Sequence, residues 1–214
     1  MSSFSAKDGA KVVESLVKVI QDNKAYLSEI DGAIGDGDHG VNMNKGFTMF
    51  KERFNPDEMD LSSALKGLGR ILLTEIGGSM GPIYGTFFIE MSKVAKDKEE
   101  ITAADFGQMF RAAQEGVQSL GNAQKGDKTL MDTLIPAVEA FEKTLSGGGD
   151  FKACLEEMKK AAKAGWESTK DMQAKIGRAS RLGERSIGVL DAGATSCWLI
   201  IQAFVDGVEP ILHA

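Results

Sequence analysis

The sequence predicts an all-α domain, built as an antiparallel up-and-down bundle or barrel of eight helices. Apolar residues recur at three- and four-residue spacing along most of the chain, as at Leu61, Leu65, Leu68 and Leu72. Strict alternation over five or more residues, the pattern of a half-buried strand, is hard to find. Short polar or glycine-containing segments separate the amphipathic stretches, and such connections favour antiparallel neighbours.

Capping patterns and prolines place the helices in order. Pro82 falls in the first turn of the fourth helix, where a missing N–H costs little, and Pro136 is expected to kink the sixth. The residues expected to cap helix N-termini are Asp60, Ser79, Thr102 together with Asp105, Asp127 and Asp150. The predicted helices span residues 5–29, 41–54, 60–76, 79–96, 102–120, 128–145, 150–175 and 192–206.

Length and charge limit the classes of function. The 214 residues, 43% of them hydrophobic, can bury one sizeable core, so residues 1–214 are expected to form a single domain. With 31 acidic and 25 basic residues, a net charge of −6 and no basic cluster, the chain should repel a nucleic-acid backbone. Nucleic acid is therefore not expected as a partner.

Cysteine usage and hydropathy favour a cytoplasmic protein. Cys154 and Cys197 form no CxxC pair and the sequence has two histidines, so neither a disulfide framework nor a Cys/His zinc site is expected. The longest apolar run near the C-terminus, around residues 197–201, is far shorter than a membrane span of roughly 20 residues. No targeting or transmembrane segment is expected.

Four connections have unusual compositions: residues 31–42, 77–81, 121–129 and 177–193. In an up-and-down bundle these four connections all emerge at the same end. Each also leads into a helix N-terminus, where free N–H groups and the helix dipole favour anions such as phosphate. We therefore expect a phosphate-bearing ligand at that end.

The first of these connections carries three aspartates, Asp31, Asp36 and Asp38, separated by glycines that let the backbone bend. Two carboxylates about 4 Å apart repel by roughly 4 kcal/mol at an effective dielectric near 20, so a loop that converges three needs a bound cation. The alternative is a surface turn with a helix cap. Asn42 and Asn44 add neutral polar groups, and oxygen ligands without sulfur favour magnesium.

Three better-known motifs do not fit. Residues 35–40 match GxGxxG, but a helix instead of a strand precedes them, and two aspartates would face the pyrophosphate. A calcium loop beginning at Asp36 lacks the required residues at its fifth, sixth and twelfth positions. Residues 121–129 miss the Walker A pattern by Asp127, leaving Lys128 either in contact with phosphate or solvated.

Several other residues allow two interpretations. His39 is either an ordinary helix-entry residue or a contact for a phosphate or a base. One of the three arginines near residue 180 is expected to point inward and hold phosphate, because the guanidinium fork suits that group. Apolar residues at the sixth helix, together with Met80, either form a slot for a base or pack in the core. The residues concerned are Arg178, Arg181 and Arg185 for phosphate, and Met80, Leu130, Met131 and Leu134 for the slot.

Four motifs in order resemble one family. They are IGDGDHGVNMNKG at residues 34–46, GGSMGPIYGTFF at 77–88, GDKT at 126–129, and GRASRLGERS at 177–186 followed by DAGAT at 191–195. Across nearly its whole length the chain resembles the L subunit, the nucleotide-binding part, of dihydroxyacetone kinase. The resemblance implies an eight-helix antiparallel barrel that holds ADP or ATP and two magnesium ions at one end.

The resemblance also implies roles for individual residues. Asp31, Asp36 and Asp38 would ligate magnesium, and Arg178 would stabilise the phosphoryl oxygens during transfer. The resemblance gives a role at the nucleotide site to Met131 instead of its neighbour Leu130, in the stretch after GDKT, which varies more than the motif. The residues that would line the nucleotide site are His39, Asn42, Ser79, Met80, Gly121, Met131, Arg178, Asp191 and Gly193.

In this family the ketose is bound covalently by a histidine of a separate K subunit or domain, which this chain is too short to include. The resemblance therefore implies a glycerone kinase subunit that is active only with partners. A phosphohistidine-bearing M subunit of the phosphotransferase system would rephosphorylate the bound ADP, and the phosphoryl group would pass to dihydroxyacetone on K. Alternatives are direct use of exchangeable ATP, another short ketose, an ADP-loaded regulatory module, or a magnesium-dependent phosphate-ester hydrolase. Whether the chain forms a homodimer stays open.

Overall fold

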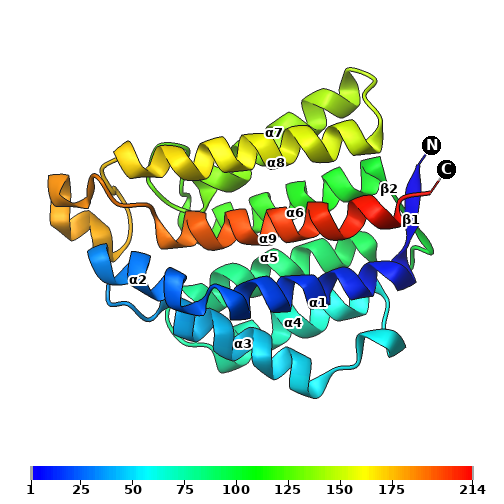
Figure 1. Ribbon diagram of the computed structural model, residues 1–214, viewed down its shortest axis with the longest axis horizontal. Helices are drawn as coiled ribbons and strands as arrows, with labels where there is room; N and C mark the ends of the chain where they lie inside the picture. Colours follow the sequence, from blue (N-terminus) through cyan, green and yellow to red (C-terminus); the bar gives the residue numbers. More distant parts are fainter. Residues whose placement is uncertain (1, 214) are drawn as a thin grey trace.

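The computed structural model describes residues 2–213, which form nine α-helices, four short 3₁₀-helices and one two-stranded sheet (Figure 1). The α-helices are α1 (Ala6–Asp22), α2 (Lys24–Ile34), α3 (His39–Arg53), α4 (Leu61–Glu75), α5 (Met80–Ala95), α6 (Ala103–Gly121), α7 (Met131–Ser146), α8 (Phe151–Ser168) and α9 (Ala192–Val208). The remaining elements are β1 (Ser3–Ser5), β2 (Glu100–Thr102), η1 (Pro56–Glu58), η2 (Thr169–Asp171), η3 (Arg178–Ser186) and η4 (Glu209–Ile211).

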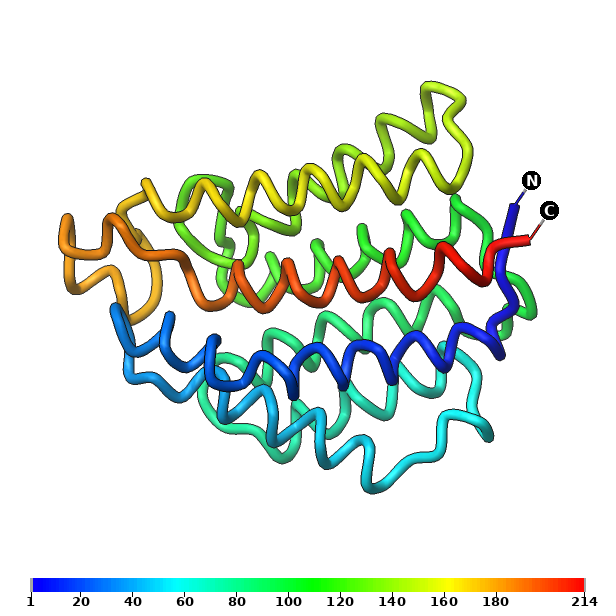
Figure 2. The backbone as a smooth tube through the Cα atoms, in the orientation of Figure 1, coloured from blue at the N-terminus to red at the C-terminus, as the bar shows by residue number. Residues whose placement is uncertain are grey.

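The helices form a closed antiparallel ring. From α3 to α9 each helix packs on the next, and α9 returns to pack on α1, which also contacts α3 and α4. Figure 2 shows the chain running back and forth along one axis, with both termini at the same end. The predicted all-α, antiparallel bundle is confirmed. Within residues 2–213, no helix has the length and apolar character needed to cross a membrane.

The core follows from the apolar stripes read in the sequence. Phe106 lies at the centre of an aromatic cluster, with ring centroids 5.0 Å from Phe110 and 5.5 Å from both Phe141 and Phe151. Such pairs add about 0.5–1.5 kcal/mol each beyond the area that they bury. The cluster joins α6, α7 and α8, so the end of the ring where α6 and α8 begin is tightly packed.

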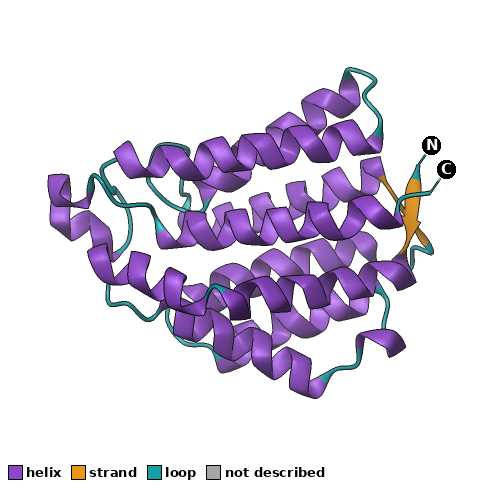
Figure 3. Cartoon of the chain, viewed as in Figure 1, coloured by secondary structure: helices purple, strands orange, loops and turns teal. Residues whose placement is uncertain are grey.

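The end that holds both termini is closed by main-chain pairing and side-chain caps. Strand β1 pairs antiparallel with β2, a small sheet that the sequence did not predict (Figure 3). Asp60 and Thr102 each form a capping box, and Asp150 accepts a hydrogen bond from the N–H of Ala153, so these predicted caps are confirmed. Ser5 caps α1 in the same way.

The opposite end, which we call the mouth, is formed by the four unusual connections (Figure 1). Residues 35–38 link α2 to α3, residues 76–79 link α4 to α5, residues 122–130 link α6 to α7, and residues 169–191 link α8 to α9. The prediction that these connections share one end of the bundle is thus confirmed.

Three predicted helices have different limits in the structure. The segment 5–29 is divided at Asn23, whose side-chain amide donates to the carbonyl of Val19, 2.8 Å away. Such a local bond competes with the helical ladder, although the apolar spacing continues into α2. The second part extends to Ile34, so Asp31 lies in a helix and not in a loop. The helix predicted over 150–175 ends at Ser168, because the chain then crosses the mouth.

The sixth helix begins at Met131 instead of residue 128, because Lys128 has a left-handed φ of +61° that no helix accommodates. Asp127 accordingly caps no helix, and its carboxylate accepts from the N–H of Gln124. Ser79 also makes no side-chain cap to α5. Pro82 lies in the first turn of α5 and Pro136 lies inside α7, as predicted.

Candidate functional site

Three aspartates converge at the mouth between α2 and α3. Asp31 lies in the last turn of α2, Asp36 in the following link, and Asp38 directly before α3. Gly37 has a φ of +77°, which glycine adopts readily, and it turns the chain between Asp36 and Asp38. One carboxylate oxygen of each aspartate lies within 4.8 Å of those of the other two. This all-oxygen set fits a hard divalent cation such as Mg²⁺.

The charges in this cluster interact strongly. Burial and the neighbouring Asp36 raise the pKa of Asp38, and a hydrogen bond from Asn42 offsets part of that rise. Desolvation acts to raise the pKa of Asp36 too, but its hydrogen bond with Asp38 and the charge of Arg178 outweigh it and leave that pKa lowered. Arg178 forms an ion pair with Asp36. One guanidinium thus faces three carboxylates, and positive charge is still needed there.

The mouth leaves helix N-termini available to anions. Within the described part of the chain, α3, α5 and α7 have no N-cap side-chain hydrogen bond, whereas α1, α4, α6 and α8, which begin at the other end, are all capped. At α3 and α7, side chains other than the N-cap residue accept a hydrogen bond from the first N–H of the helix: Asp31 accepts from the N–H of His39, and Thr129 accepts from the N–H of Met131. The N-terminus of α5, at Ser79 and Met80, is the most open of these sites for an anion.

Glycines give a ligand access to the backbone around the mouth. A Cβ atom built on any of five of them would meet no other atom within 4 Å. Bare backbone facing open space is suited to close approach by a ligand. These glycines are Gly77, Gly78, Gly121, Gly177 and Gly188.

His39 is held in the interior, facing away from open space. Its Nε2 lies 2.9 Å from the hydroxyl of Ser196, which lies 2.6 Å from the hydroxyl of Tyr84. Tyr84 also donates to the carbonyl of Gly193 at 3.3 Å. Burial lowers the pKa of His39 to about 4, despite the nearby carboxylate of Asp31, so the ring is neutral at pH 7. The main chain of His39 faces the aspartates, while its Nε2 points towards α9.

A second group of predicted residues lies where α9 begins. Asp191 caps α9 by accepting from the N–H of Ala194 at 2.7 Å, and burial raises its pKa to about 6. A Cβ on Gly193 would lie 3.5 Å from the backbone nitrogen of Leu130, so the two connections approach closely here. Met131 is fully buried and Leu130 is 6% exposed. Both side chains of this pair are therefore buried in this structure.

The apolar slot suggested by the sequence is filled by core packing in this structure. Leu134 is fully buried with Met131, and Met80 keeps 8% of its surface exposed. All four residues of the set thus belong to the buried core. Arg178, Arg181 and Arg185 are all exposed, so the expectation that one of them points inward is wrong, although Arg178 pairs with Asp36.

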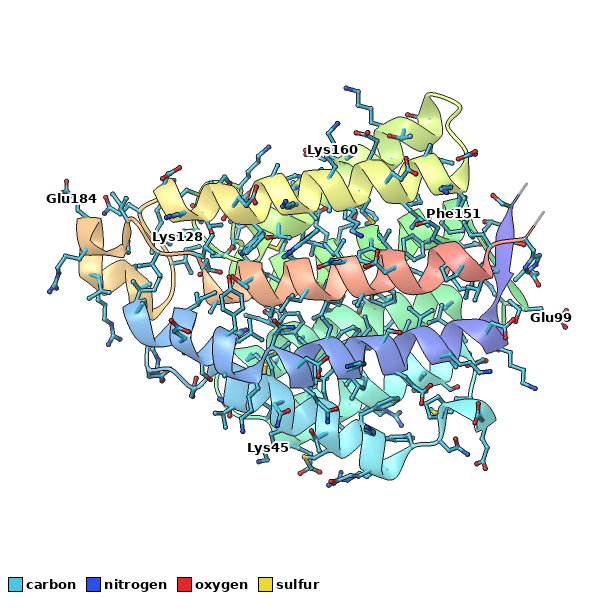
Figure 4. All side chains as sticks on the ribbon, viewed as in Figure 1. Lys45, Glu99, Lys128, Phe151, Lys160 and Glu184 are labelled. Carbon is cyan, nitrogen blue, oxygen red and sulfur yellow. The ribbon has the colours of Figure 1, made fainter. Side chains whose placement is uncertain are left out.

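Lys128 is neither solvated nor free to reach phosphate, so both interpretations of this residue were wrong. Its side chain is 1% exposed, and its ammonium donates to three backbone carbonyls. Figure 4 labels it inside the mouth end of the bundle, while Glu184 lies at the outer tip. The physical reason is long-range: the acceptors lie 44 to 61 residues further along the chain.

Sequence reasoning also missed Tyr84 and Ser196. Both are buried polar residues in helices that are otherwise strongly apolar, and they connect α5, α9 and the start of α3. The available signal was the pair Thr195 and Ser196 between apolar neighbours in α9, since buried hydroxyls need partners.

Comparison with known proteins identifies the class of this helical domain. The chain matches the family model described as the DAK2 domain over residues 33–206. The chain therefore belongs to the DAK2 domain family.

Individual relatives agree with this assignment. The chain is 41% identical over 178 residues to the PEP-dependent dihydroxyacetone kinase, ADP-binding subunit DhaL of Escherichia coli, covering 83% of this chain and 85% of the relative. It is 39% identical to the PTS-dependent dihydroxyacetone kinase, ADP-binding subunit DhaL of Lactococcus lactis, covering 88% and 91% of the two chains. The resemblance to the L subunit of dihydroxyacetone kinase is confirmed.

Solved structures support the fold. The dihydroxyacetone kinase of C. freundii matches with a TM-score of 0.70 at 21% identity, covering 92% of this chain and 34% of that one. The same kinase in complex with AMP-PNP and Mg²⁺ matches with a TM-score of 0.67 at 22% identity. The chain thus spans about a third of that longer kinase, and at this identity the likeness concerns the fold alone.

Proposed function

We propose that this chain is the nucleotide-binding subunit of a multi-component dihydroxyacetone kinase. Its mouth would hold ADP or ATP with two Mg²⁺ ions, and the phosphoryl group would pass to dihydroxyacetone on a partner K-type subunit. A phosphohistidine-bearing M-type subunit would rephosphorylate the bound ADP. The main support is the convergence of three carboxylate oxygens within 4.8 Å, together with the 41% identity to an ADP-binding subunit.

The proposed site residues have different chemical roles. Asp31, Asp36 and Asp38 would hold the metal, which when bound would neutralise phosphate charge. The α5 N-terminus at Ser79 and Met80 would donate N–H bonds to phosphate. The other residues proposed to line the nucleotide are His39 and Asn42 beside the aspartates, Gly121 at the end of α6, and Met131, Asp191 and Gly193 where α7 and α9 begin.

Arg178 is proposed as the group that stabilises the transferring phosphoryl group. Its guanidinium forms an ion pair with Asp36, one of the proposed metal ligands, so its donors would be available to phosphoryl oxygens held at this cluster. Phosphoryl transfer needs little covalent chemistry from the protein, since positioning and electrostatic stabilisation supply most of the rate. No side chain of this chain has to become phosphorylated.

The test is Asp36→Asn, which removes one charged ligand while nearly preserving shape. We expect phosphoryl transfer to dihydroxyacetone, measured with K- and M-type partner subunits and Mg²⁺, to fall by about 10²–10³-fold. The helical circular-dichroism signal should stay unchanged. Asp57→Asn, an exposed aspartate at the far end of the bundle, is the matched control and should keep full activity. Full magnesium-dependent activity of Asp36→Asn would defeat the assignment.

Native mass spectrometry of the purified chain separates this proposal from its alternatives. Retained ADP with two Mg²⁺ ions supports a resident cofactor, whereas an empty chain with weak, exchangeable ATP favours direct use of ATP. A chain that binds ADP but supports no transfer with any partner would be a regulatory module. Release of inorganic phosphate by the chain alone would indicate a hydrolase.

A further inference from the structure

One buried charge at the mouth has no part in the function proposed above. The ammonium of Lys128 donates to the backbone carbonyls of Met172 at 3.1 Å, Ser186 at 2.5 Å and Val189 at 2.6 Å. An ammonium carries three donors and no acceptor, so these bonds use its full capacity. Lys128 is therefore committed to holding main chain and cannot also bind a ligand.

The three acceptors lie at the two stems of one segment. Met172 follows η2, where the chain leaves α8, whereas Ser186 ends η3 and Val189 precedes α9. Between the stems, residues 173–185 carry Arg178, which forms the ion pair with Asp36. A single buried cation thus joins both ends of the segment that carries the arginine.

Other bonds strengthen the same closure. The N–H of Ala174 donates to the hydroxyl of Ser186 at 2.9 Å, across the two stems. The N–H of Lys175 donates to the carbonyl of Asp127 at 3.1 Å, which ties the segment to the connection that carries Lys128. The segment is thus attached to the connection before α7 both by this main-chain hydrogen bond and by the ammonium of Lys128.

Burying this charge costs free energy that a simple structural role would not require. Removing an ammonium from water is unfavourable unless it is fully hydrogen-bonded, and an apolar side chain would fill the space without that cost. Lys128 also has a left-handed φ of +61°, which is unfavourable for a residue with a long side chain. Its value must therefore lie in what the three carbonyls position.

We propose that Lys128 is a positioning residue that clasps segment 172–189 against the start of α7 and so holds Arg178 over the aspartate cluster. The inference rests on the proposed function, because it assigns Lys128 to act through the arginine of that site. It gives the GDKT motif a role in geometry instead of phosphate binding.

Hydrogen exchange tests the clasp without any assay of activity. In Lys128→Met, the protection of the amides of Ala174, Lys175 and Gly188, which are hydrogen-bonded in the stems, should fall at least about 10-fold. Lys125→Met, an exposed lysine of the same connection, is the matched control and should leave protection unchanged. Unchanged protection in Lys128→Met overturns the proposal, whether or not the chain is a kinase subunit.

A double-mutant cycle with Arg178→Gln tests whether the clasp acts through the arginine. Lys128→Met should lower kcat for transfer about 10²-fold, as expected for a misplacement near 1 Å, and change the ADP affinity less than about 3-fold. In the double variant the loss should not exceed that of Arg178→Gln alone. Losses that multiply show independent action and overturn the proposal.

Failures of the two proposals are distinguishable. If the parent chain transfers no phosphoryl group, the proposed function fails, while hydrogen exchange still decides the clasp. If Lys128→Met does not fold, Lys128→Arg takes its place, because it keeps the charge but replaces the three-proton ammonium with a planar fork. It should give a smaller loss that is again non-additive with Arg178→Gln, and additive losses would overturn the proposal.

Discussion

Replacing Gly40 with alanine should push α3 away from α2 and open the aspartate cluster. Gly40 lies in the first turn of α3, where the two helices touch. A Cβ at this position would lie 2.0 Å from the carbonyl oxygen of Lys24 and 2.8 Å from the backbone nitrogen of Ser28. Both atoms belong to the main chain of α2, so no flexible side chain can move aside.

The size of the shift follows from these distances. Real Cβ contacts essentially never fall below 3.0 Å, so the helices must separate by about 1 Å, the difference between 3.0 Å and 2.0 Å. Overpacking of this kind costs about 1–3 kcal/mol, and the better helix propensity of alanine returns about 0.5–1 kcal/mol. We expect a net loss of about 1–2 kcal/mol in the free energy of unfolding.

The same shift should weaken metal binding. Asp31 is carried by α2 and Asp38 stands at the start of α3, so separation of the helices widens the cluster. Mg²⁺ requires near-ideal octahedral geometry at about 2.0–2.1 Å and tolerates such widening poorly. Urea unfolding without metal gives the stability, and calorimetric titration of Mg²⁺ with ADP present gives the affinity.

Gly32→Ala, on the facing helix α2, is the matched control. A Cβ at Gly32 would have its nearest neighbour, the Cα of Gly37, at an ordinary 3.8 Å. This variant should be as stable as the parent chain or up to about 1 kcal/mol more stable. If Gly40→Ala matched Gly32→Ala in both unfolding free energy and Mg²⁺ affinity, the close approach of α2 and α3 would not be what sets the cluster.

Two further variants test the buried network and the titration of the mouth. Tyr84→Phe removes the 2.6 Å hydrogen bond to the hydroxyl of Ser196, which keeps its bonds to His39 and Gly193, and should lower the unfolding free energy by about 0.5–1.5 kcal/mol; an unchanged urea midpoint would contradict this. Burial raises the pKa of Asp191 to about 6, above the roughly 3.9 of an unfolded chain, so its favourable contribution to folding is present below about pH 4 and is lost as pH rises through about 6. Asp191→Asn keeps a capping acceptor but does not titrate. The difference in unfolding free energy between this variant and the parent chain should therefore shift by about 2 kcal/mol in favour of the variant from about pH 4.5 to about pH 7.5. An equal difference at both pH values would contradict this.

The parts of the structure that the sequence could predict are those set by neighbours along the chain. Apolar spacing gave the helical class, and the alternation of the helices placed the unusual connections at one end. The aspartate cluster was accessible because its members lie within eight residues, from Asp31 to Asp38, with glycines between them. Local capping chemistry was likewise correct at Asp60, Thr102 and Asp150.

The parts that could not be predicted depend on distant partners. The break at Asn23 is invisible to apolar spacing, because the stripe continues on both sides of it. The burial of Lys128 requires carbonyls that lie up to 61 residues away, and the bond from His39 to Ser196 spans 157 residues. No local pattern carries such information, so a lysine in a polar connection is naturally expected to be solvated.

The two ends of the bundle differ in a way that a purely structural domain would not explain. At the far end, helix N-termini are satisfied by their own caps and by strand pairing, so that end is complete within the chain. At the mouth, the chain converges carboxylates, leaves the α5 N-terminus open and buries one lysine. Each of these features lowers stability when the chain is alone. A metal-bridged phosphate would supply the cation that the aspartates lack and the anion that the α5 N-terminus lacks, so one ligand would meet both deficits.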